Sequence, residues 1–562
     1  MGLASAPGVQ TIASSAVEEL LRAGATAHSD LQALADIGHH GEYPGNTRRD
    51  LISRYPISKE LPLPVMLDVP SLISSCQPEV QFEKCPVLMP HELFHSLWSN
   101  FNGHFTASFA DGLEQFWNSV PPDDPRLVRH PMLIDKPDWR RQAVPIVVHG
   151  DGVRFSQHGN NLISVQWSFL LSSGWGWDEI YFAGSFPKSV RCFESVHGCD
   201  TWAILWKWIV FGLRAGYDGI FPANDADGNP WAAGTAQHNL ANDVRLVAGG
   251  EYFMVVWVLA ADADFASNEL HIAHHAGMNC CPWCPATLDN FRDVRKTSSW
   301  QMNQYSLDNC PPLPGHDLFT LPGMTIFHYP GDFMHTFHLG VDLYLHGGTI
   351  RDLTSPDGPF AGNEKARHDQ LWGMIATAYD AIGITSRLPG LHVGATGRTG
   401  PGYLRAKASA SKHLTKAMAH VLERLPLDTV AQQTRLLCYQ NLVAAHAIID
   451  DGGLFWGEDQ ADCLCNHIHE FLLLYNVLVR DSIDRRTGHF NFTVKFHLAF
   501  HEALFARYLN PKAHWCFKYE NFIGLVQQCA ESCTAGTRMA MVPQKLLDNY
   551  LRLLSIRLAR CC

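Results

Sequence analysis

The stretch from Val255 to Cys284 constrains the fold more than any other part of this 562-residue chain. It begins with the apolar run VVWVLAA and continues through DADFASNELHIAHHAGMN to the cysteine motif CCPWC. A short apolar run between polar residues is typical of a strand that is buried on both faces. Asp262 and Asp264 follow the end of this strand, and the ends of strands are where the sites of α/β proteins lie.

Two kinds of metal ligand occur in this stretch. The aspartates offer hard carboxylate oxygens, which suit a divalent ion such as Mg²⁺. Cys281 and Cys284 are separated by two residues, a spacing that suits zinc. Cys280 is an alternative to Cys281 as a ligand. The sequence therefore predicts two metals of different kinds.

Three further strands are predicted upstream. The β-branched run VPIVVHGDGVRFS begins at Val144 and is followed by NNLISVQWSFLL and WDEIYFAGSF. The apolar segment from Trp202 to Leu213 predicts a helix, and Tyr252 to Ala261 a fourth strand. Three strands, a helix and another strand predict the opening of a ribonuclease H-like α/β fold.

A mainly helical insertion is expected to interrupt this core. Helical periodicity is clearest over Ser411 to Leu425, Thr429 to Ile449 and Asp462 to Val479. Prolines and serines between Leu61 and Val80 predict an extended linker within the helical N-terminal region. We therefore divide the chain into an N-terminal helical and linker region (1–140), the first part of the core (141–285), a loop-rich and then helical insertion (286–485), and the C-terminal helices that complete the core (486–562).

Composition limits the classes of function. A chain with 46% hydrophobic and 17% charged residues is expected to be globular. Its formal charge of −12 opposes a broad nucleic-acid surface, because phosphate binding needs clustered Lys and Arg. The apolar segments fall short of the roughly 20 residues that cross a bilayer, and the first residues lack a secretory pattern. We expect an intracellular protein without a membrane partner, whose 16 cysteines are free or bind metal.

Asp151 lies between two glycines at the end of the first predicted strand, where a ligand can approach the backbone closely. The alternative is a turn aspartate that accepts backbone N–H groups. Asp262 is expected on the neighbouring strand, so the two carboxylates would share Mg²⁺ ions. Two ions about 3.5–4 Å apart can activate a water or a 3′-hydroxyl and stabilise the leaving oxygen in phosphodiester chemistry. Asp264 remains an alternative to Asp262.

Two late segments supply the remaining candidates. Glu520, in HWCFKYENFIGLV, stands near the start of a predicted helix, where an acid is ordinarily a charge favoured by the helix dipole. A ribonuclease H-like fold needs a late helical carboxylate to close its metal site, and Glu520 fits that need. His335 and His338, in GDFMHTFHLGV, are the predicted partners of Cys281 and Cys284 in a tetrahedral zinc site. Free thiols are the alternative.

A histidine cluster supports a different function. His271, His274 and His275 recur at i, i+3 and i+4, which on a helix puts them on one face, as in zinc hydrolases. The HExxH signature is absent, and the chain has 30 histidines, so a surface or core role is the simpler interpretation.

Taken together over about residues 144–550, these motifs resemble the catalytic core of eukaryotic cut-and-paste transposases of the DDE superfamily, nearest to the CACTA (En/Spm) and Plavaka-like groups. IVVHGDGVRFS is similar to the family's first acidic motif through Asp151. The second acid precedes a Cys-x-x-Cys by about 20 residues, as Asp262 does. Asp332, His335 and the LGV that follows match an Asp-x-x-His string, and Glu520 matches the final acid.

The resemblance implies Mg²⁺-dependent DNA cleavage and strand transfer by Asp151, Asp262 and Glu520, with transposon ends as the partner DNA and a nuclear location. It is compatible with a structural zinc and with a homo-oligomer. Two departures matter: Ala-Asp replaces the usual Gly-Asp at the second acid, and no DNA-binding finger or helix-turn-helix is recognised at the amino end. A second hypothesis is a domesticated, catalytically inactive derivative that binds DNA or protein, which the negative charge favours.

Overall fold

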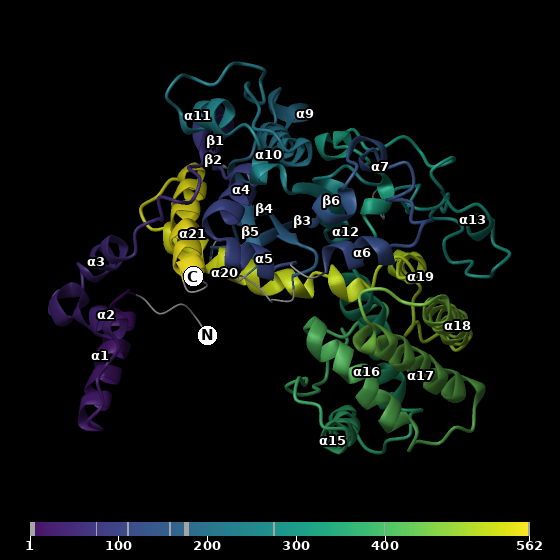
Figure 1. Cartoon of the computed structure of the whole chain (residues 1–562). Helices are drawn as coiled ribbons and strands as arrows, with labels where there is room; N and C mark the ends of the chain where they lie inside the picture. Colours follow the sequence, from purple (N-terminus) through teal and green to yellow (C-terminus); the bar gives the residue numbers. More distant parts are fainter. Residues whose placement is uncertain are drawn as a thin grey trace.

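The computed structural model describes residues 6–74, 76–109, 112–156, 159–172, 179–273, 276–397 and 399–559. A four-stranded sheet lies at the centre, and a helical block extends to one side of it (Figure 1). The mixed α/β class predicted from the sequence is confirmed. Among the described residues, no helix combines the length and the apolar character that a membrane span requires.

The sheet consists of β3 (Ala143–Arg154), β4 (Asn161–Phe169), β5 (Ile180–Pro187) and β6 (Phe253–Ala260), in the order β5-β4-β3-β6. The first three strands are antiparallel neighbours, whereas β6 runs parallel to β3. Every residue of β5 and β6 is buried, which explains why both read as uninterrupted apolar runs. All four predicted strands are confirmed.

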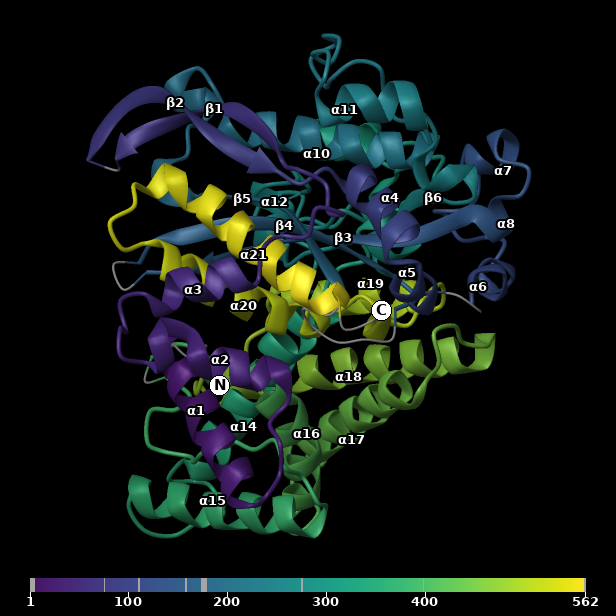
Figure 2. The same ribbon diagram turned by 60° about the vertical axis from the view of Figure 1, so that its left-hand side comes forward.

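Helix α10 (Thr201–Asp218) makes the crossover from β5 to β6. It begins where the Asp200 side chain accepts hydrogen bonds from the N–H groups of Trp202 and Ala203, and it ends at Gly219 in the left-handed conformation. This helix and α4 (Pro90–Asn100) lie on one side of the sheet, opposite α20 (Phe517–Cys533) and α21 (Val542–Ala559) (Figures 1 and 2).

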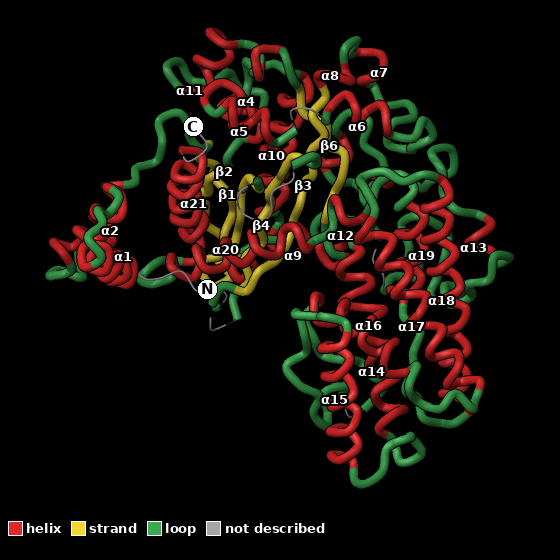
Figure 3. Tube along the Cα trace, turned by 60° about the horizontal axis from the view of Figure 1, so that its bottom comes forward, coloured by secondary structure: helices red, strands yellow, loops and turns green. Residues whose placement is uncertain are grey.

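The N-terminal region differs from its prediction in one respect. Helices α1 (Ala6–Arg22), α2 (Ser29–His40) and α3 (Thr47–Arg54) project away from the sheet (Figures 1 and 3). The expected linker, however, is the antiparallel hairpin of β1 (Val65–Ser74) and β2 (Gln77–Val87). The linker prediction was wrong because edge strands tolerate the prolines on which it rested.

Shorter helices fill the connections around the sheet. Those before and beside it are α5 (Asn102–Ala107), α6 (Leu113–Ser119), α7 (Met132–Asp135), α8 (Trp139–Gln142), α9 (Glu194–His197) and α11 (Ala236–Asn239). Two follow the last strand, namely α12 (Ala263–Asn268) and α13 (Ser299–Met302).

The helical block begins at the π-helical segment η7 (Met334–Val341). It contains α14 (Asp342–Thr354), α15 (Glu364–Ala381), α16 (Ala408–Leu422), α17 (Val430–Asp451) and α18 (Glu458–Asp484). The predicted helical insertion is therefore confirmed, and it lies beside the sheet (Figure 3). Helix α19 (Val494–Phe505) then packs on α18 and η7 and leads the chain back to the sheet.

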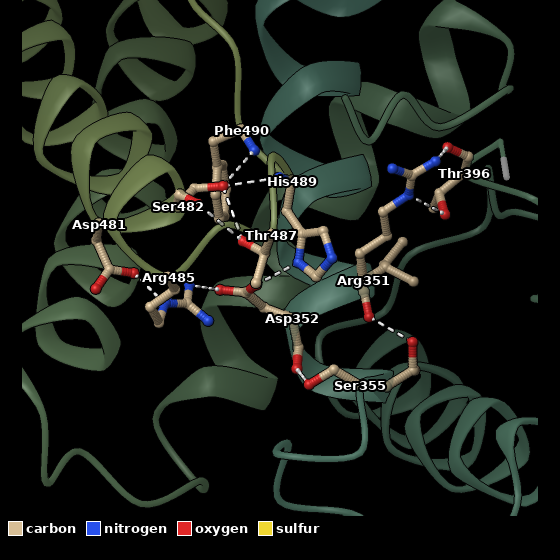
Figure 4. A network of polar contacts seen from close by, with 12 residues as sticks. Arg351, Asp352, Ser355, Thr396, Asp481, Ser482, Arg485, Thr487, His489 and Phe490 are labelled. Carbon is tan, nitrogen blue, oxygen red and sulfur yellow. Dashed lines mark hydrogen bonds and ion pairs between the residues drawn. The ribbon is translucent and has the colours of Figure 1, made fainter. Parts of the chain in front are cut away.

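One buried carboxylate ties this block together. Asp352 of α14 accepts hydrogen bonds from Arg485 (2.9 Å) and His489 (2.5 Å) (Figure 4). It also accepts one from Arg435 of α17 (2.5 Å). Burial would raise the pKa of Asp352, but the bond from His489 and the charges of the two arginines outweigh burial and lower it. The carboxylate is therefore ionised at neutral pH and links α14 to α17 and α18.

Candidate functional site

Two acids lie at neighbouring strand ends. His149 of β3 pairs with Ala260 of β6 in the parallel register. Continuing that register by two residues aligns Asp151 with Asp262. Because side chains alternate along a strand, Asp151 lies on the same face as His149. The predicted meeting of the two carboxylates at one sheet edge therefore agrees with the register.

Asp262 is fixed at the start of α12. Its Oδ1 accepts a hydrogen bond from the N–H of Phe265 (2.6 Å), which caps the helix. The Phe265 ring lies over Gly150, where an added Cβ would come within 2.0 Å of it. The first glycine of the Gly-Asp-Gly motif therefore lets α12 approach β3 and brings Asp262 toward Asp151.

The third acid arrives on α20. Tyr519 stacks on the His149 ring, with 4.2 Å between centroids and an angle of 4° between planes. Its hydroxyl lies 2.9 Å from the Ser168 hydroxyl of β4. These contacts hold the first turn of α20 against the face of the sheet that carries Asp151. Glu520, the next residue, is exposed at this edge.

The charges of Asp262 and Glu520 act on Asp151. Burial, the charge of Asp262 and the charge of Glu520 raise the pKa of Asp151 to about 7. The Gly152 N–H, which donates to Asp151 Oδ1 (2.6 Å), and the charge of His335 oppose the rise without cancelling it. Residues that are more than 350 positions apart in the sequence thus share one electrostatic site.

His335 belongs to this acidic site. Its Nδ1 lies 2.5 Å from Oδ2 of the buried Asp332. Burial lowers its pKa, but the bond and charge of Asp332 and the charges of Asp262 and Asp151 prevail and raise it to about 9. The pKa of Asp332 falls to about 2, because His335 and the Cys516 N–H (2.9 Å) outweigh burial. At neutral pH, an imidazolium therefore stands beside the three acids.

A cavity of about 650 Å³ opens beside Asp262, and neither Asp151 nor Glu520 lines it. Its polar wall contains Asp262, Asp264, His335 and Lys495. Asp264 is exposed in the first turn of α12, whereas Asp262 is half-buried and is the one that acts on Asp151. The geometry favours Asp262 over Asp264 as the second acid.

The cysteine motif has other partners than the predicted ones. Cys281 and Cys284 lie with His497 and His501 of α19, and one ligand atom from each falls within 4.8 Å of all the others. Sγ of Cys284 lies 3.3 Å from Nε2 of His497. The four side chains are buried. His335 lies in the acidic site instead, so its predicted pairing with the cysteines was wrong.

The electrostatics of the cysteine motif fit a cation. Burial raises the pKa of Cys284, but hydrogen bonds with Cys281, His497 and His501 outweigh burial and lower it to about 3. Burial raises the pKa of Cys281 well above its ordinary value and lowers that of His497. These shifts favour the thiolate of Cys284 and the neutral imidazole of His497, the forms that bind a metal ion. Cys280 points to the Ala286 carbonyl (3.7 Å) and lies outside the group.

His338, the other predicted zinc ligand, lies in a third buried group with Asp342 and His446. Asp332, His335 and Cys516 form another such group. The described residues thus contain three groups of His, Cys and Asp side chains that are able to bind a metal ion, and Asp151, Asp262 and Glu520 are not one of them. The sequence did carry a signal for the true partners of the cysteines, because His497 and His501 are four residues apart on one helix face.

The histidine cluster considered for a zinc hydrolase is only partly described. His271 is exposed and follows the end of α12, with its ring 5.7 Å from that of His316. His274 and His275 lie outside the described residues.

Comparison of the chain with protein-family models and with curated proteins gives no match. Its chemistry is therefore inferred from the geometry of these groups.

Proposed function

We propose that the chain catalyses Mg²⁺-dependent DNA strand cleavage and transfer, with Asp151, Asp262 and Glu520 holding two ions. The observation that carries the proposal is the arrangement of the strand ends and α20. The β3–β6 register aligns Asp151 with Asp262, and the stack of Tyr519 on His149 brings the helix turn that carries Glu520 to the same face of the sheet. The raised pKa of Asp151 supports the proposal, because the other two carboxylates contribute to the rise. Gathering three acids is electrostatically costly, and divalent cations relieve that cost. Carboxylate oxygens also suit Mg²⁺.

The topology supports a ribonuclease H-like core for this site. Three antiparallel strands are followed by a crossover helix and a strand parallel to the first. The chain then leaves for the helical block and returns with α20, which carries the third acid. This is the arrangement that the resemblance to DDE transposases implies.

The chain's own groups have separate tasks in this mechanism. When bound, the two ions would activate the attacking oxygen and stabilise the leaving one. The cap at Phe265 and the stack on His149 orient Asp262 and Glu520. The His335 imidazolium supplies a positive charge that attracts a phosphodiester into an otherwise acidic site.

We also propose that Cys281, Cys284, His497 and His501 bind a structural zinc ion. A Cys₂His₂ set with no open position is typical of structural sites. The ion would fix the segment after β6 to α19. Cys281→Ser and His501→Asn should each lower the zinc measured by elemental analysis by one ion per chain, whereas His335→Gln should leave it unchanged. Zinc content equal to that of the wild type in both site variants would reject these ligands.

The catalytic proposal is tested with the full chain and DNA that carries the sequences flanking its own coding region. With Mg²⁺, the wild type should produce strand breaks, and Asp151→Asn, Asp262→Asn and Glu520→Gln should reduce them to background. Asp264→Asn is the matched control and should cleave normally. Loss in Asp264→Asn with retention in Asp262→Asn would reassign the second acid.

An inactive, DNA- or protein-binding derivative is the second candidate function. The formal charge of −12 is the observation that favours it, because a DNA-cleaving protein needs positive charge along the substrate. A wild type that binds Mg²⁺ and DNA without cleaving would support this candidate. Both candidate functions include DNA as a partner and a nuclear location.

A further inference from the structure

We propose that His338, Asp342 and His446 form a further metal site, which takes a transition-metal dication such as Zn²⁺ where the helical block meets the core. His338 lies within the π-helical segment η7, Asp342 begins α14, and His446 comes from the C-terminal part of α17. One ligand atom from each lies within 4.8 Å of the other two. This proposal does not depend on the catalytic proposal.

The spacing of the donor atoms fits a small ion. Nδ1 of His338 lies 2.9 Å from Oδ2 of Asp342, and Nε2 of His446 lies 3.7 Å from the same oxygen. Ligand atoms bound tetrahedrally at about 2.0–2.1 Å are roughly 3.3 Å apart. The two distances lie on either side of that value, so shifts of a few tenths of an ångström would complete the geometry.

Unsatisfied buried atoms point to a missing ligand. The side chains of His338, Asp342 and His446 are 1%, 0% and 7% exposed. Nε2 of His446 and Oδ1 of Asp342 have no hydrogen-bond partner among the described residues. The 3.7 Å separation is too long for a hydrogen bond. Buried polar atoms are rarely left unpaired in proteins, so these two unpaired atoms need an explanation, and a bound ion is one.

Charge in the surroundings is compatible with an ion. The rings of His338 and His446 lie 4.8 Å apart between centroids, and the Asp342 carboxylate beside them is fully buried. A buried carboxylate needs a cation or hydrogen-bond donors to compensate its charge. Lys412 is the nearby positive charge, and Asp450 neutralises it through an ion pair of 2.5 Å.

The donor set indicates the class of metal. Imidazole nitrogens favour Zn²⁺ and other transition metals over Mg²⁺. Three protein ligands leave one tetrahedral position for water. The site should therefore release its ion to a chelator faster than the four-ligand cysteine site does.

The location gives the ion a positioning role. The His338 ring packs against Trp515 (6.3 Å between centroids) and Phe517 (5.6 Å), at the start of the helix that carries Glu520. The same π-helical segment carries His335. An ion here would hold α17 and η7 together, close to His335 and Glu520 of the acidic site. π-Helical segments such as η7 often occur at functional sites.

Zinc stoichiometry of the full chain tests the proposal. Protein produced with added zinc should hold two ions per chain, one of them at the cysteines. Asp342→Asn and His446→Gln should each lower the count to one. His346→Gln is the matched control, because this buried histidine bonds to Tyr439 and Ser411 outside the group, and it should retain two. Two ions in every variant, or one in the wild type, would overturn the proposal.

A second measurement remains decisive if the variants fold poorly. Crystals of the zinc-replete wild type should show an anomalous peak among the three side chains. Replacement of the zinc by Co²⁺ should fill two sites. The cysteine site should show thiolate-to-cobalt absorption, whereas the site at His338, Asp342 and His446 should not. A zinc-replete crystal without density between His338 and His446 would contradict the assignment, whatever the outcome of the DNA-cleavage experiment.

Discussion

Binding of Mg²⁺ should expel a proton from Asp151. Without metal, burial and the charges of Asp262 and Glu520 hold the pKa of this carboxyl at about 7, against an ordinary value of 3.8. A cation at the carboxylate favours its ionised form, so the metal-bound group is deprotonated at neutral pH. Metal and proton therefore compete for the same oxygen atoms.

The magnitude follows from the pKa. A carboxyl with a pKa of about 7 carries roughly 0.9 proton at pH 6, about 0.5 at pH 7 and about 0.1 at pH 8, and these are the protons released. The folded pKa lies above the unfolded one, so the metal-free fold loses stability as pH rises through the window from about 4 to about 7. The full shift corresponds to about 4 kcal/mol, and partial solvent access reduces this to roughly 1–2 kcal/mol.

Calorimetric titration of Mg²⁺ in two buffers of different ionisation enthalpy measures the protons released at each pH. Chelators must be absent, because they would also remove zinc. Asp151→Asn should abolish the protons released by this carboxyl. The protons that this variant still releases, such as those from His335, are subtracted from the wild-type value. Asp264→Asn should release protons as the wild type does. A release that is independent of pH, or equal in Asp151→Asn, would refute the reasoning.

Three further changes test the architecture around the site. Gly150→Ala places a Cβ within 2.0 Å of an aromatic ring and should cost about 1–3 kcal/mol of stability, whereas Gly152→Ala meets only a flexible side chain and should melt near the wild-type temperature. In denaturant unfolding, Tyr519→Phe should lower the stability by about 1 kcal/mol and Tyr519→Ala by about 3–5 kcal/mol. Strand cleavage should be lost only in Tyr519→Ala. Equal losses of stability and cleavage in the two variants would show that the stack does not position α20. Asp352→Ala leaves Arg435 unpaired in the helical block and should destabilise the chain by about 3–5 kcal/mol; an unchanged unfolding midpoint would contradict the role assigned to this network.

The sheet and two of its acids could be predicted because their signals are local. Buried strands produce continuous apolar runs, and the acids at their ends follow directly in the sequence. The register then aligns Asp151 with Asp262. Glu520 could be singled out only from the expected ribonuclease H-like fold and the resemblance, since a first-turn acid has no local signature of a metal site.

The histidines that lie with Cys281 and Cys284 could not be predicted from spacing alone. Cys284 and His497 are 213 positions apart, and only the docking of α19 brings them together. His335 and His338 had equally plausible spacing. The structure separates these two into different groups, because Asp332 binds the first and Asp342 the second.

The hairpin was missed for a different reason. Pro70 and Pro78 contributed to the prediction of a linker, but both lie in the two-stranded sheet of β1 and β2. The buried residues Val69, Cys85 and Val87 attach it to the core.

The most direct test of the two-ion site is a crystal structure of the full chain grown with Mn²⁺ as the anomalous stand-in for Mg²⁺. We expect two peaks about 3.5–4 Å apart, held by Asp151, Asp262 and Glu520. Carboxylates more than about 10 Å apart, or Mn²⁺ bound only elsewhere, would contradict the account.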